Sequence, residues 1–319
     1  MAVAVPAVAR HGAVMDQITH GDLGTPRFSA REITQYRRDG YVVARGIMGP
    51  RSVAACTAAL SDLATGRPAA RETVLMYEAG HDPATIAPEQ REGAIRKYMD
   101  FVGDAPALEM AAMNRRLHAL LDQLLGEGRV LFQEMALVKP PHIGTEKPWH
   151  QDAAYFRLTD PGLIVGVWIA LDPASRENGC MELVPGSHLD GTMPHQHEND
   201  FNRCRIVPQH VRAAERIAIE MQPGDALIFH SLLHHYTAPN ASALRRQAVQ
   251  FHYHQIGAAW GDLAAHQRLF RFANGSYAGC TVPHAPAPDE RAPGEPVRKS
   301  GYVYRAGLAR PIVPIDPPD

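Results

Sequence analysis

The period of hydrophobic and polar positions changes near Gly128. Before this residue apolar side chains recur three and four positions apart, and after it they alternate with polar ones as far as residue 256. The first spacing places apolar side chains on one face of a helix, and the second places them on one face of a strand. The pattern therefore predicts a helical N-terminal part followed by a β-rich core.

Local signals set the ends of the predicted helices. Ser29 and Glu32 form a capping-box pattern at the start of the first one, and glycines end the first two. Between the second and third helices, residues 67–93 are irregular and rich in Pro, Gly and charge, which predicts a long loop that could border a pocket. The predicted helices span residues 29–40, 50–66 and 106–125.

Short strands separated by Gly and Pro turns are predicted in the second part. One of them is almost continuously apolar, as expected of a strand buried on both faces, and the others alternate. Such strands after a helical part predict a mainly β fold with flanking helices, either a sandwich or a jelly roll. The predicted strands span residues 130–139, 163–171, 217–221, 226–229 and 247–253. One face of the first strand should carry Leu131, Gln133, Met135, Leu137 and Lys139.

Composition and charge exclude several classes of partner. Of the 319 residues, 45% are hydrophobic and 21% are charged, which is ordinary for a globular chain. A net charge of -2 gives no field that would recruit nucleic acid or an anionic membrane, and no apolar run is long enough to span a bilayer. We therefore expect neither a nucleic-acid nor a membrane partner.

Cysteine spacing and the N-terminus predict a cytoplasmic protein. The 4 cysteines lie far apart without a Cys-x-x-Cys spacing, which disfavours both a thiolate zinc site and a disulfide framework, so reduced thiols are expected. The N-terminus lacks the basic leader of a signal peptide. The expected organisation is a flexible arm (1–28) and one domain (29–319), made of a helical part (29–127), a β core (128–256) and a C-terminal extension (257–319).

A candidate metal site lies at His150-Gln151-Asp152. In an extended segment alternate side chains share a face, so the imidazole of His150 and the carboxylate of Asp152 can converge on one point. Two histidines and one carboxylate on one side of a metal, with the remaining positions open, suit Fe(II) in oxygenases. The chain holds 17 histidines, so these residues alone fit a hydrogen-bonded surface pair equally well. A second histidine is needed to decide.

That histidine belongs to a series of ordered motifs. After the His-x-Asp pair come a tryptophan in an apolar strand, an Asn-Gly-Cys turn, a Pro-Gly-Ser-His motif, a Gly-Asp turn, a histidine and an arginine eleven residues later. Over residues 29–256 this order resembles the phytanoyl-CoA dioxygenase family of Fe(II)- and 2-oxoglutarate-dependent oxygenases. The residues concerned are His150, Asp152, Trp168, Asn178, Gly179, Cys180, Pro185, Gly186, Ser187, His188, Gly224, Asp225, His235, Asn240 and Arg246.

The resemblance implies a double-stranded β-helix, that is, a cupin-like jelly roll, and a reaction. Such an enzyme uses Fe(II), 2-oxoglutarate and O2 to hydroxylate, or alternatively to desaturate or cyclise, a small organic substrate, with succinate and CO2 as co-products. His150, Asp152 and His235 would hold the iron. Relatives that chlorinate have a small residue in place of Asp152, so this chain is expected not to halogenate. The alternative is a cupin-like metal-binding protein without oxygenase activity.

The resemblance also implies residues for the co-substrate and substrate. Arg246 would pair with the far carboxylate of 2-oxoglutarate, unless it lies on the surface as Arg245 is expected to. Gln133, a polar residue on an otherwise apolar strand face, is a further candidate. Tyr155 and Phe156 would line the substrate side, or else form a core aromatic pair. The other co-substrate candidates are Thr237, Lys97, Met135 and Trp168, the last of which equally fits core packing.

Two features depart from the family pattern or remain open. Tyr236-Thr237 replaces the usual Gly-Ser after the metal histidine. His234 lies directly beside His235, and because consecutive strand residues face opposite sides, His234 is expected to be a hydrogen-bonded neighbour and not a metal ligand. Residues 189–211 are rich in His and Arg and could form a basic lid, or, through His195 and His197, a separate zinc site.

Overall fold

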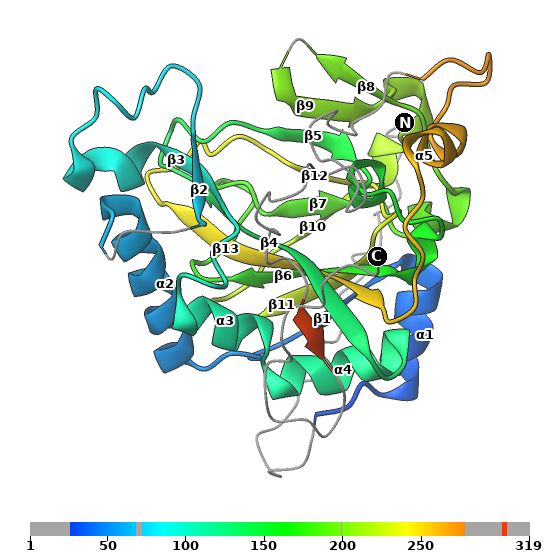
Figure 1. Cartoon of the computed structure of the whole chain (residues 1–319), viewed down its shortest axis with the longest axis horizontal. Helices are drawn as coiled ribbons and strands as arrows, with labels where there is room; N and C mark the ends of the chain where they lie inside the picture. Colours follow the sequence, from blue (N-terminus) through cyan, green and yellow to red (C-terminus); the bar gives the residue numbers. More distant parts are fainter. Residues whose placement is uncertain (1–25, 68–71, 199, 278–301, 305–319) are drawn as a thin grey trace, which may run out of the picture.

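Two antiparallel sheets face each other as a jelly roll in the computed structural model, which describes residues 26–67, 72–198, 200–277 and the backbone of 302–304 (Figure 1). The major sheet has the order β1 (Tyr41–Ala44), β11 (Ala226–His230), β6 (Ile164–Ala170), β13 (Arg246–Gln255), β4 (Arg129–Lys139), β3 (Ile95–Met99) and β2 (Val74–Tyr77), and β14 (Tyr302–Tyr304) also pairs with β4. The minor sheet has the order β10 (Ile217–Ile219), β7 (Met181–Leu183), β12 (His235–Thr237) and β5 (Lys147–His150). A hairpin of β8 (His195–Glu198) and β9 (Asp200–Ile206) lies beside β5.

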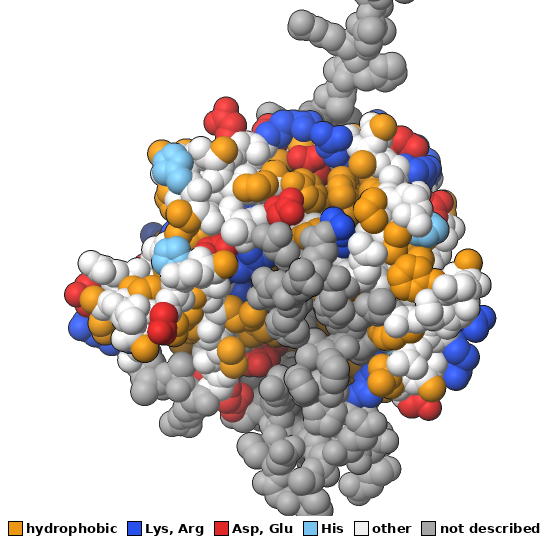
Figure 2. Space-filling model, turned by 90° about the horizontal axis from the view of Figure 1, so that it is seen from above, with side chains coloured by type: hydrophobic (Ala, Val, Ile, Leu, Met, Phe, Trp, Pro, Cys, Tyr) orange, Lys and Arg blue, Asp and Glu red, His pale blue; other side chains and the backbone are white. Residues whose placement is uncertain are grey.

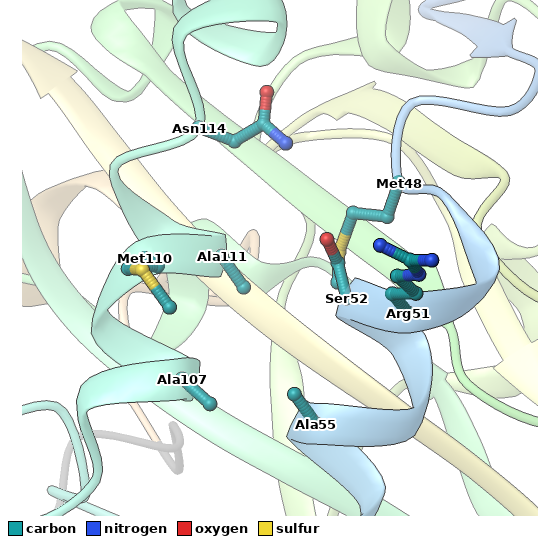
Figure 3. Close-up of a pocket in the computed structure, with 8 residues that line it drawn as sticks. All are labelled: Met48, Arg51, Ser52, Ala55, Ala107, Met110, Ala111 and Asn114. Atoms are coloured by element: carbon teal, nitrogen blue, oxygen red, sulfur yellow. The ribbon is translucent and has the colours of Figure 1, made fainter.

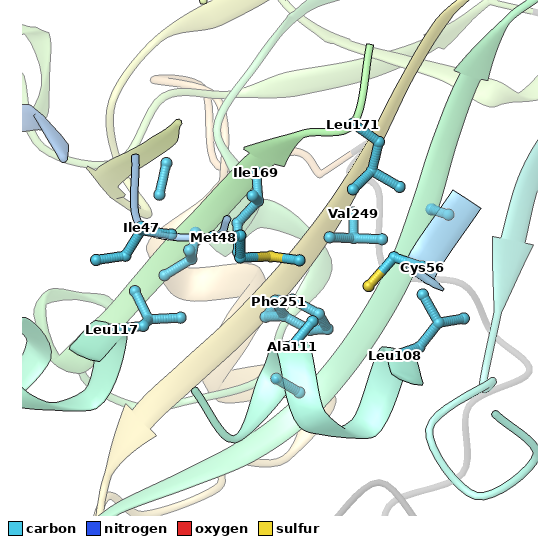
Figure 4. Packing of buried hydrophobic residues seen from close by; sticks show 14 of the residues in the cluster. Ile47, Met48, Cys56, Leu108, Ala111, Leu117, Ile169, Leu171, Val249 and Phe251 are labelled. Carbon is cyan, nitrogen blue, oxygen red and sulfur yellow. The ribbon is translucent and has the colours of Figure 1, made fainter. Parts of the chain in front are cut away.

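Helices cover the outer face of the major sheet, below the sheets in Figure 1. They are α1 (Ala30–Asp39), α2 (Pro50–Thr65), α3 (Pro106–Ala112) and α4 (Arg115–Leu125), while α5 (Leu263–Leu269) follows the last long strand. Figure 4 shows Val249 and Phe251 of β13 packed against Met48, Cys56 and Leu108 from the helical side. A second apolar cluster, which includes Trp168, Leu183 and Phe229, fills the space between the sheets. The polar side chains of a functional site therefore have to lie at the edge of this inner apolar cluster.

The N-terminal part confirms two predicted helices and corrects the third. Ser29 caps α1 with a complete capping box, and α2 begins at Pro50. The prediction of a single helix over 106–125 is wrong. The side chain of Asn114 accepts hydrogen bonds from two backbone N–H groups and caps the start of α4, which is a separate helix. The loop predicted over 67–93 is also wrong in part, since it contains β2 and the 3₁₀ helix η1 (Pro88–Ala94).

A β-bulge in β4 corrects the predicted strand face. Tyr253 of β13 pairs with Leu131, while His252 pairs with Gln133, so Phe132 is an extra residue. Leu131 consequently packs in the outer cluster under the helices, and Phe132 turns inward. The expectation that Leu131 shares a face with Met135 is wrong, because the bulge reverses the alternation between them.

The expectations about thiols and membranes have different outcomes. Cys56 and Cys180 are free and buried, but Cys204 is disulfide-bonded, so the expectation of reduced thiols throughout is wrong. Every helix in the described ranges is too short or too polar to cross a membrane. On the face shown in Figure 2, basic and acidic side chains of the described residues are interspersed, which agrees with the small net charge of -2.

Buried neutral histidines predict that acid destabilises the metal-free protein. Burial lowers the pKa of His118 to about 3 and those of His230 and His266 to about 4, against 6.5 ordinarily. The unfolded chain therefore binds protons first, and stability that is complete above about pH 6.5 is lost as the pH falls towards 4. Each such histidine contributes a slope of up to about 1.4 kcal/mol per pH unit in this range.

Urea unfolding of the metal-free protein at pH 7.5, 6 and 5 tests this prediction, with values chosen to bracket the ordinary histidine pKa of about 6.5. A His118→Gln variant, whose amide does not titrate, should lose stability less steeply than the wild type. Stability that stays constant or rises on acidification would contradict the prediction.

Candidate active site

Three buried side chains converge beside the inner cluster. His150 ends β5 and pairs directly with His235, the first residue of β12. Asp152 lies in the 3₁₀ helix η2 (Asp152–Tyr155) that follows β5. One donor atom from each residue lies within 4.8 Å of the others. Asp152 Oδ1 is 3.3 Å from His150 Nε2 and 3.5 Å from His235 Nε2.

Backbone carbonyls fix which ring nitrogen of each histidine faces this cluster. His150 Nδ1 lies 2.8 Å from the carbonyl of Pro148, and His235 Nδ1 lies 2.9 Å from that of Leu233. A carbonyl only accepts, so each Nδ1 carries the proton and Nε2 of the neutral ring presents its lone pair. When both rings are neutral, two nitrogen lone pairs and a carboxylate oxygen therefore meet at one point. This arrangement suits a divalent cation, and the ligand set fits iron(II).

Electrostatics keep the donor atoms in the states that ligation requires. Burial, followed by the nearby His235, lowers the pKa of His150 to about 3, so this ring is neutral near pH 7. Burial alone would raise the pKa of Asp152, but the imidazoles of His235 and His252 bring it well below its usual range. A neutral imidazole and an ionised carboxylate are the forms that bind a metal.

Gln151, between the two ligand candidates, anchors the segment from the opposite side. Its amide donates to the carbonyls of Gly191 and Leu232, both at 2.8 Å, and accepts from the backbone N–H of Met193. The backbone N–H of Gln151 donates to His195 Nε2, and His195 Nδ1 faces the carbonyl of Met193. Both ring nitrogens of His195 are thus engaged, which removes it from the suggested zinc site.

His234 and Tyr236 point away from the metal cluster. The His234 ring is fully buried, but its nitrogens have no hydrogen-bond partner among the described residues, so the expectation of a hydrogen-bonded side chain is wrong. Tyr236 stacks on Trp149, with ring centroids 5.4 Å apart, and donates to Glu146 Oε2 at 3.2 Å. The bulk that replaces the usual glycine therefore lies on the outer side of the minor sheet.

Arg246 extends from β13 into the space between the sheets. It is 2% exposed, lies 5.5 Å from the Trp168 ring centroid and donates to the Leu137 carbonyl at 3.2 Å. Burial lowers its pKa to about 10, so it remains a cation. Its Nε and the indole N–H of Trp168 are buried donors without partners among the described residues. Arg245 instead faces outward, bound to Asp172 and Glu92.

The other co-substrate candidates lie on the strands around this space. Met135 on β4 and Thr237 on β12 are buried, and Gln133 on β4 is partly buried. Lys97 of β3 pairs in register with Leu137, and withdrawal from water lowers its pKa to about 8, partly offset by Asp152. Each is thus on an element that borders the metal cluster or Arg246.

The two substrate candidates have different surroundings. The ring centroids of Tyr155 and His150 lie 6.0 Å apart, and the Tyr155 hydroxyl accepts a hydrogen bond from Lys147 Nζ at 2.6 Å. Phe156 packs edge-on against Phe132 and against His252, at 4.8 and 4.9 Å between centroids. Tyr155 therefore lies next to a ligand candidate, whereas Phe156 belongs to an aromatic cluster.

Sequence reasoning missed three buried polar residues in this region. Gln250 and His252 of β13 contact Asp152. Lys139 pairs in register with Arg246 and donates to the Thr145 carbonyl, and burial, followed by repulsion from Arg246, lowers its pKa well below the usual value. The available signal was a row of polar residues at alternate positions of otherwise apolar strands.

A separate pocket lies on the far side of the major sheet. It has a volume of about 270 Å³ and opens between α2 and α3, where Figure 3 shows Met48, Arg51, Met110 and Asn114 around it. Its lining holds one charged side chain and no histidine or carboxylate. The pocket therefore does not coincide with the candidate site.

Comparisons with known proteins agree with this geometry. The family model described as phytanoyl-CoA dioxygenase (PhyH) matches residues 36–248. A probable phytanoyl-CoA dioxygenase of Caenorhabditis elegans is 27% identical over 252 residues, which cover 75% of this chain and 78% of that protein. The peroxisomal phytanoyl-CoA dioxygenase of Homo sapiens is 29% identical over 169 residues, 51% of this chain and 50% of that protein.

Solved structures share the fold. The non-heme alpha ketoglutarate dependent carbocyclase SnoK from nogalamycin biosynthesis has a TM-score of 0.58 at 23% identity, covering 73% of this chain and 86% of that one. EctD from S. alaskensis, solved with 2-oxoglutarate and 5-hydroxyectoine, has a TM-score of 0.55 at 22% identity, covering 77% and 83%. With the family model matching most of the chain, this protein belongs to the phytanoyl-CoA dioxygenase family of iron(II)- and 2-oxoglutarate-dependent oxygenases.

Proposed function

We propose that this chain hydroxylates a small organic substrate, with iron(II) held by His150, Asp152 and His235. The observation that carries the proposal is the convergence of two imidazole lone pairs and one carboxylate oxygen on a single buried point. When bound, the iron would supply the redox chemistry that couples the oxidative decarboxylation of 2-oxoglutarate to the oxidation of a carbon–hydrogen bond. The residues around the iron would bind and orient 2-oxoglutarate and the substrate, and would exclude water.

Arg246 is the proposed partner of the far carboxylate of 2-oxoglutarate. The guanidinium is buried, retains its charge and has a donor without a partner among the described residues. A buried unpaired donor is costly, and a carboxylate accepts from it in a charge-assisted bond. Lys97 would add a second positive charge, and Thr237 a hydroxyl. Met135, Trp168 and Gln133 would form the walls of the same site.

The substrate is proposed to approach on the side of Tyr155 and Phe156, which follow the metal motif. The described part of residues 189–211 contains the end of the 3₁₀ helix η4 (Ser187–Asp190), the β8–β9 pair next to β5, and the 3₁₀ helix η5 (Pro208–His210). A lid role for this segment is part of the proposal. Asp152 occupies the position that is small in chlorinating relatives, which supports oxygen transfer over halogenation. A cytoplasmic location also remains a proposal.

The competing function is a cupin-like protein in which a metal only stabilises the barrel. A structural metal site is normally closed by four protein ligands, whereas this cluster offers three among the described residues. The strand whose Gln250 contacts Asp152 also carries Arg246, a buried arginine whose Nε has no partner in that part of the chain. Incubation with iron(II), 2-oxoglutarate, ¹⁸O2, chloride and a panel of candidate small molecules distinguishes an oxygenase from a protein that only binds the metal. Mass spectrometry should find a product that has gained labelled oxygen, or one that has lost two hydrogens, and no chlorinated product.

A further inference from the structure

The second carboxylate oxygen of Asp152 is held by two side chains of β13. His252 Nε2 lies 2.8 Å and Gln250 Nε2 lies 3.2 Å from Oδ2, while Oδ1 faces the two histidines of the metal cluster. Asp152, Gln250 and His252 are 5%, 4% and 1% exposed, so water does not compete for these contacts. The two carboxylate oxygens therefore have different surroundings.

Hydrogen-bond chemistry assigns the protons in this group. An ionised carboxylate only accepts, so both His252 Nε2 and the Gln250 amide donate to Oδ2. The 3.2 Å contact between Gln250 Nε2 and His252 Nε2 then joins two donors and is not a hydrogen bond. His252 Nδ1 has no partner among the described residues. The only hydrogen bond of this ring in that part of the chain is the one to Asp152.

The fold explains why these two residues reach Asp152. Alternation along β13 places Arg246, Ala248, Gln250 and His252 on the inward face, opposite Val249 and Phe251 in the outer core. The bulge at Phe132 turns that ring inward, where it lies 6.1 Å from the His252 ring, and Phe156 lies 4.9 Å from the same His252 ring. The imidazole is thus fixed by packing while its Nε2 points at the carboxylate.

We propose that Gln250 and His252 are positioning residues that hold Asp152 as a one-oxygen metal ligand. Two donors on Oδ2 keep the carboxylate from turning to present both oxygens to the metal, so Oδ1 alone binds and the open coordination positions are preserved. Hydrogen bonds from outer residues to ligating groups raise metal affinity in this way. The inference rests on the proposed iron site and adds to it two residues that act through Asp152.

The test compares isosteric variants that remove one donor each. His252→Phe and Gln250→Met should each weaken iron(II) binding about 10–100-fold, the range typical of outer partners of metal ligands. His254→Phe is the matched control, because His254 lies on the same strand, is buried and also packs on Phe132, but does not contact Asp152. His252→Gln, which retains an N–H donor, should recover part of the affinity.

The measurement is the dissociation constant of iron(II) from anaerobic calorimetric titration, with urea unfolding of each metal-free variant to confirm folding. Wild-type affinity in both His252→Phe and Gln250→Met, or an equal loss in His254→Phe, would overturn the inference. If His252→Phe does not fold, Gln250→Met decides alone. Failure of the wild type to bind iron(II) would instead refute the proposed metal site, so the two failures are distinguishable.

Discussion

Replacing Asp152 by alanine should reduce the conversion of 2-oxoglutarate to succinate to the background level. The variant removes the carboxylate of the metal cluster and leaves two imidazoles, which hold a divalent cation far less well. The loss should exceed the roughly 10–100-fold effect typical of outer partners. His150→Ala and His235→Ala should behave alike, because each removes one of the three converging donor atoms. Succinate is measured by mass spectrometry, and circular dichroism confirms the fold.

His234→Ala is the control for this set. His234 is buried beside His235 but has no atom in the metal cluster, so its variant should retain activity. Activity retained in His235→Ala and lost in His234→Ala would show that the wrong histidine had been assigned.

Arg246→Ala should raise the KM for 2-oxoglutarate at least about tenfold. The far carboxylate would lose a charge-assisted hydrogen bond worth roughly 1.5–3 kcal/mol, and about 1.4 kcal/mol corresponds to a factor of ten. Arg246→Lys keeps a charge but loses the fork that binds two carboxylate oxygens, so it should recover only part of the affinity. Initial rates at varied 2-oxoglutarate concentration give the KM.

Arg245→Ala is the matched control for Arg246. It removes an arginine next in sequence that faces outward and binds Asp172 and Glu92. We expect a lower free energy of unfolding with an unchanged KM for 2-oxoglutarate. An unchanged KM in Arg246→Ala, or a larger rise in Arg245→Ala, would contradict the assignment of the co-substrate arginine.

The metal cluster was predictable because its signals are local. His150 and Asp152 lie two positions apart, and the spacing to Arg246 distinguished His235 from His234. Apolar patterning predicted β4, β6, β10, β11 and β13, but not β5 and β12, which carry the two histidines. The strand pattern allowed a sandwich or a jelly roll, and the resemblance implied the jelly roll. Burial of both faces of β6 was likewise predictable, because its sequence is apolar throughout, and every residue of that strand is buried in the structure.

Features set by contacts between distant segments were not predictable. The helical spacing of Met110, Met113 and Leu117 continues across Asn114, so the pattern hides the cap that starts α4. The bulge at Phe132 is defined by pairing with β13 and has no local signature. The polar residues Gln250 and His252 were visible in a strand, but their contact with Asp152 exists only once β13 and the turn after β5 are brought together.

The most direct test of the proposed function is whether the purified protein converts 2-oxoglutarate to succinate in an iron-dependent manner. We predict succinate with added iron(II) and O2, none after chelation, and recovery when iron(II) is restored. Binding of iron(II) by the wild type without any succinate, across the panel of candidate substrates, would contradict it and favour a metal-binding protein without oxygenase activity.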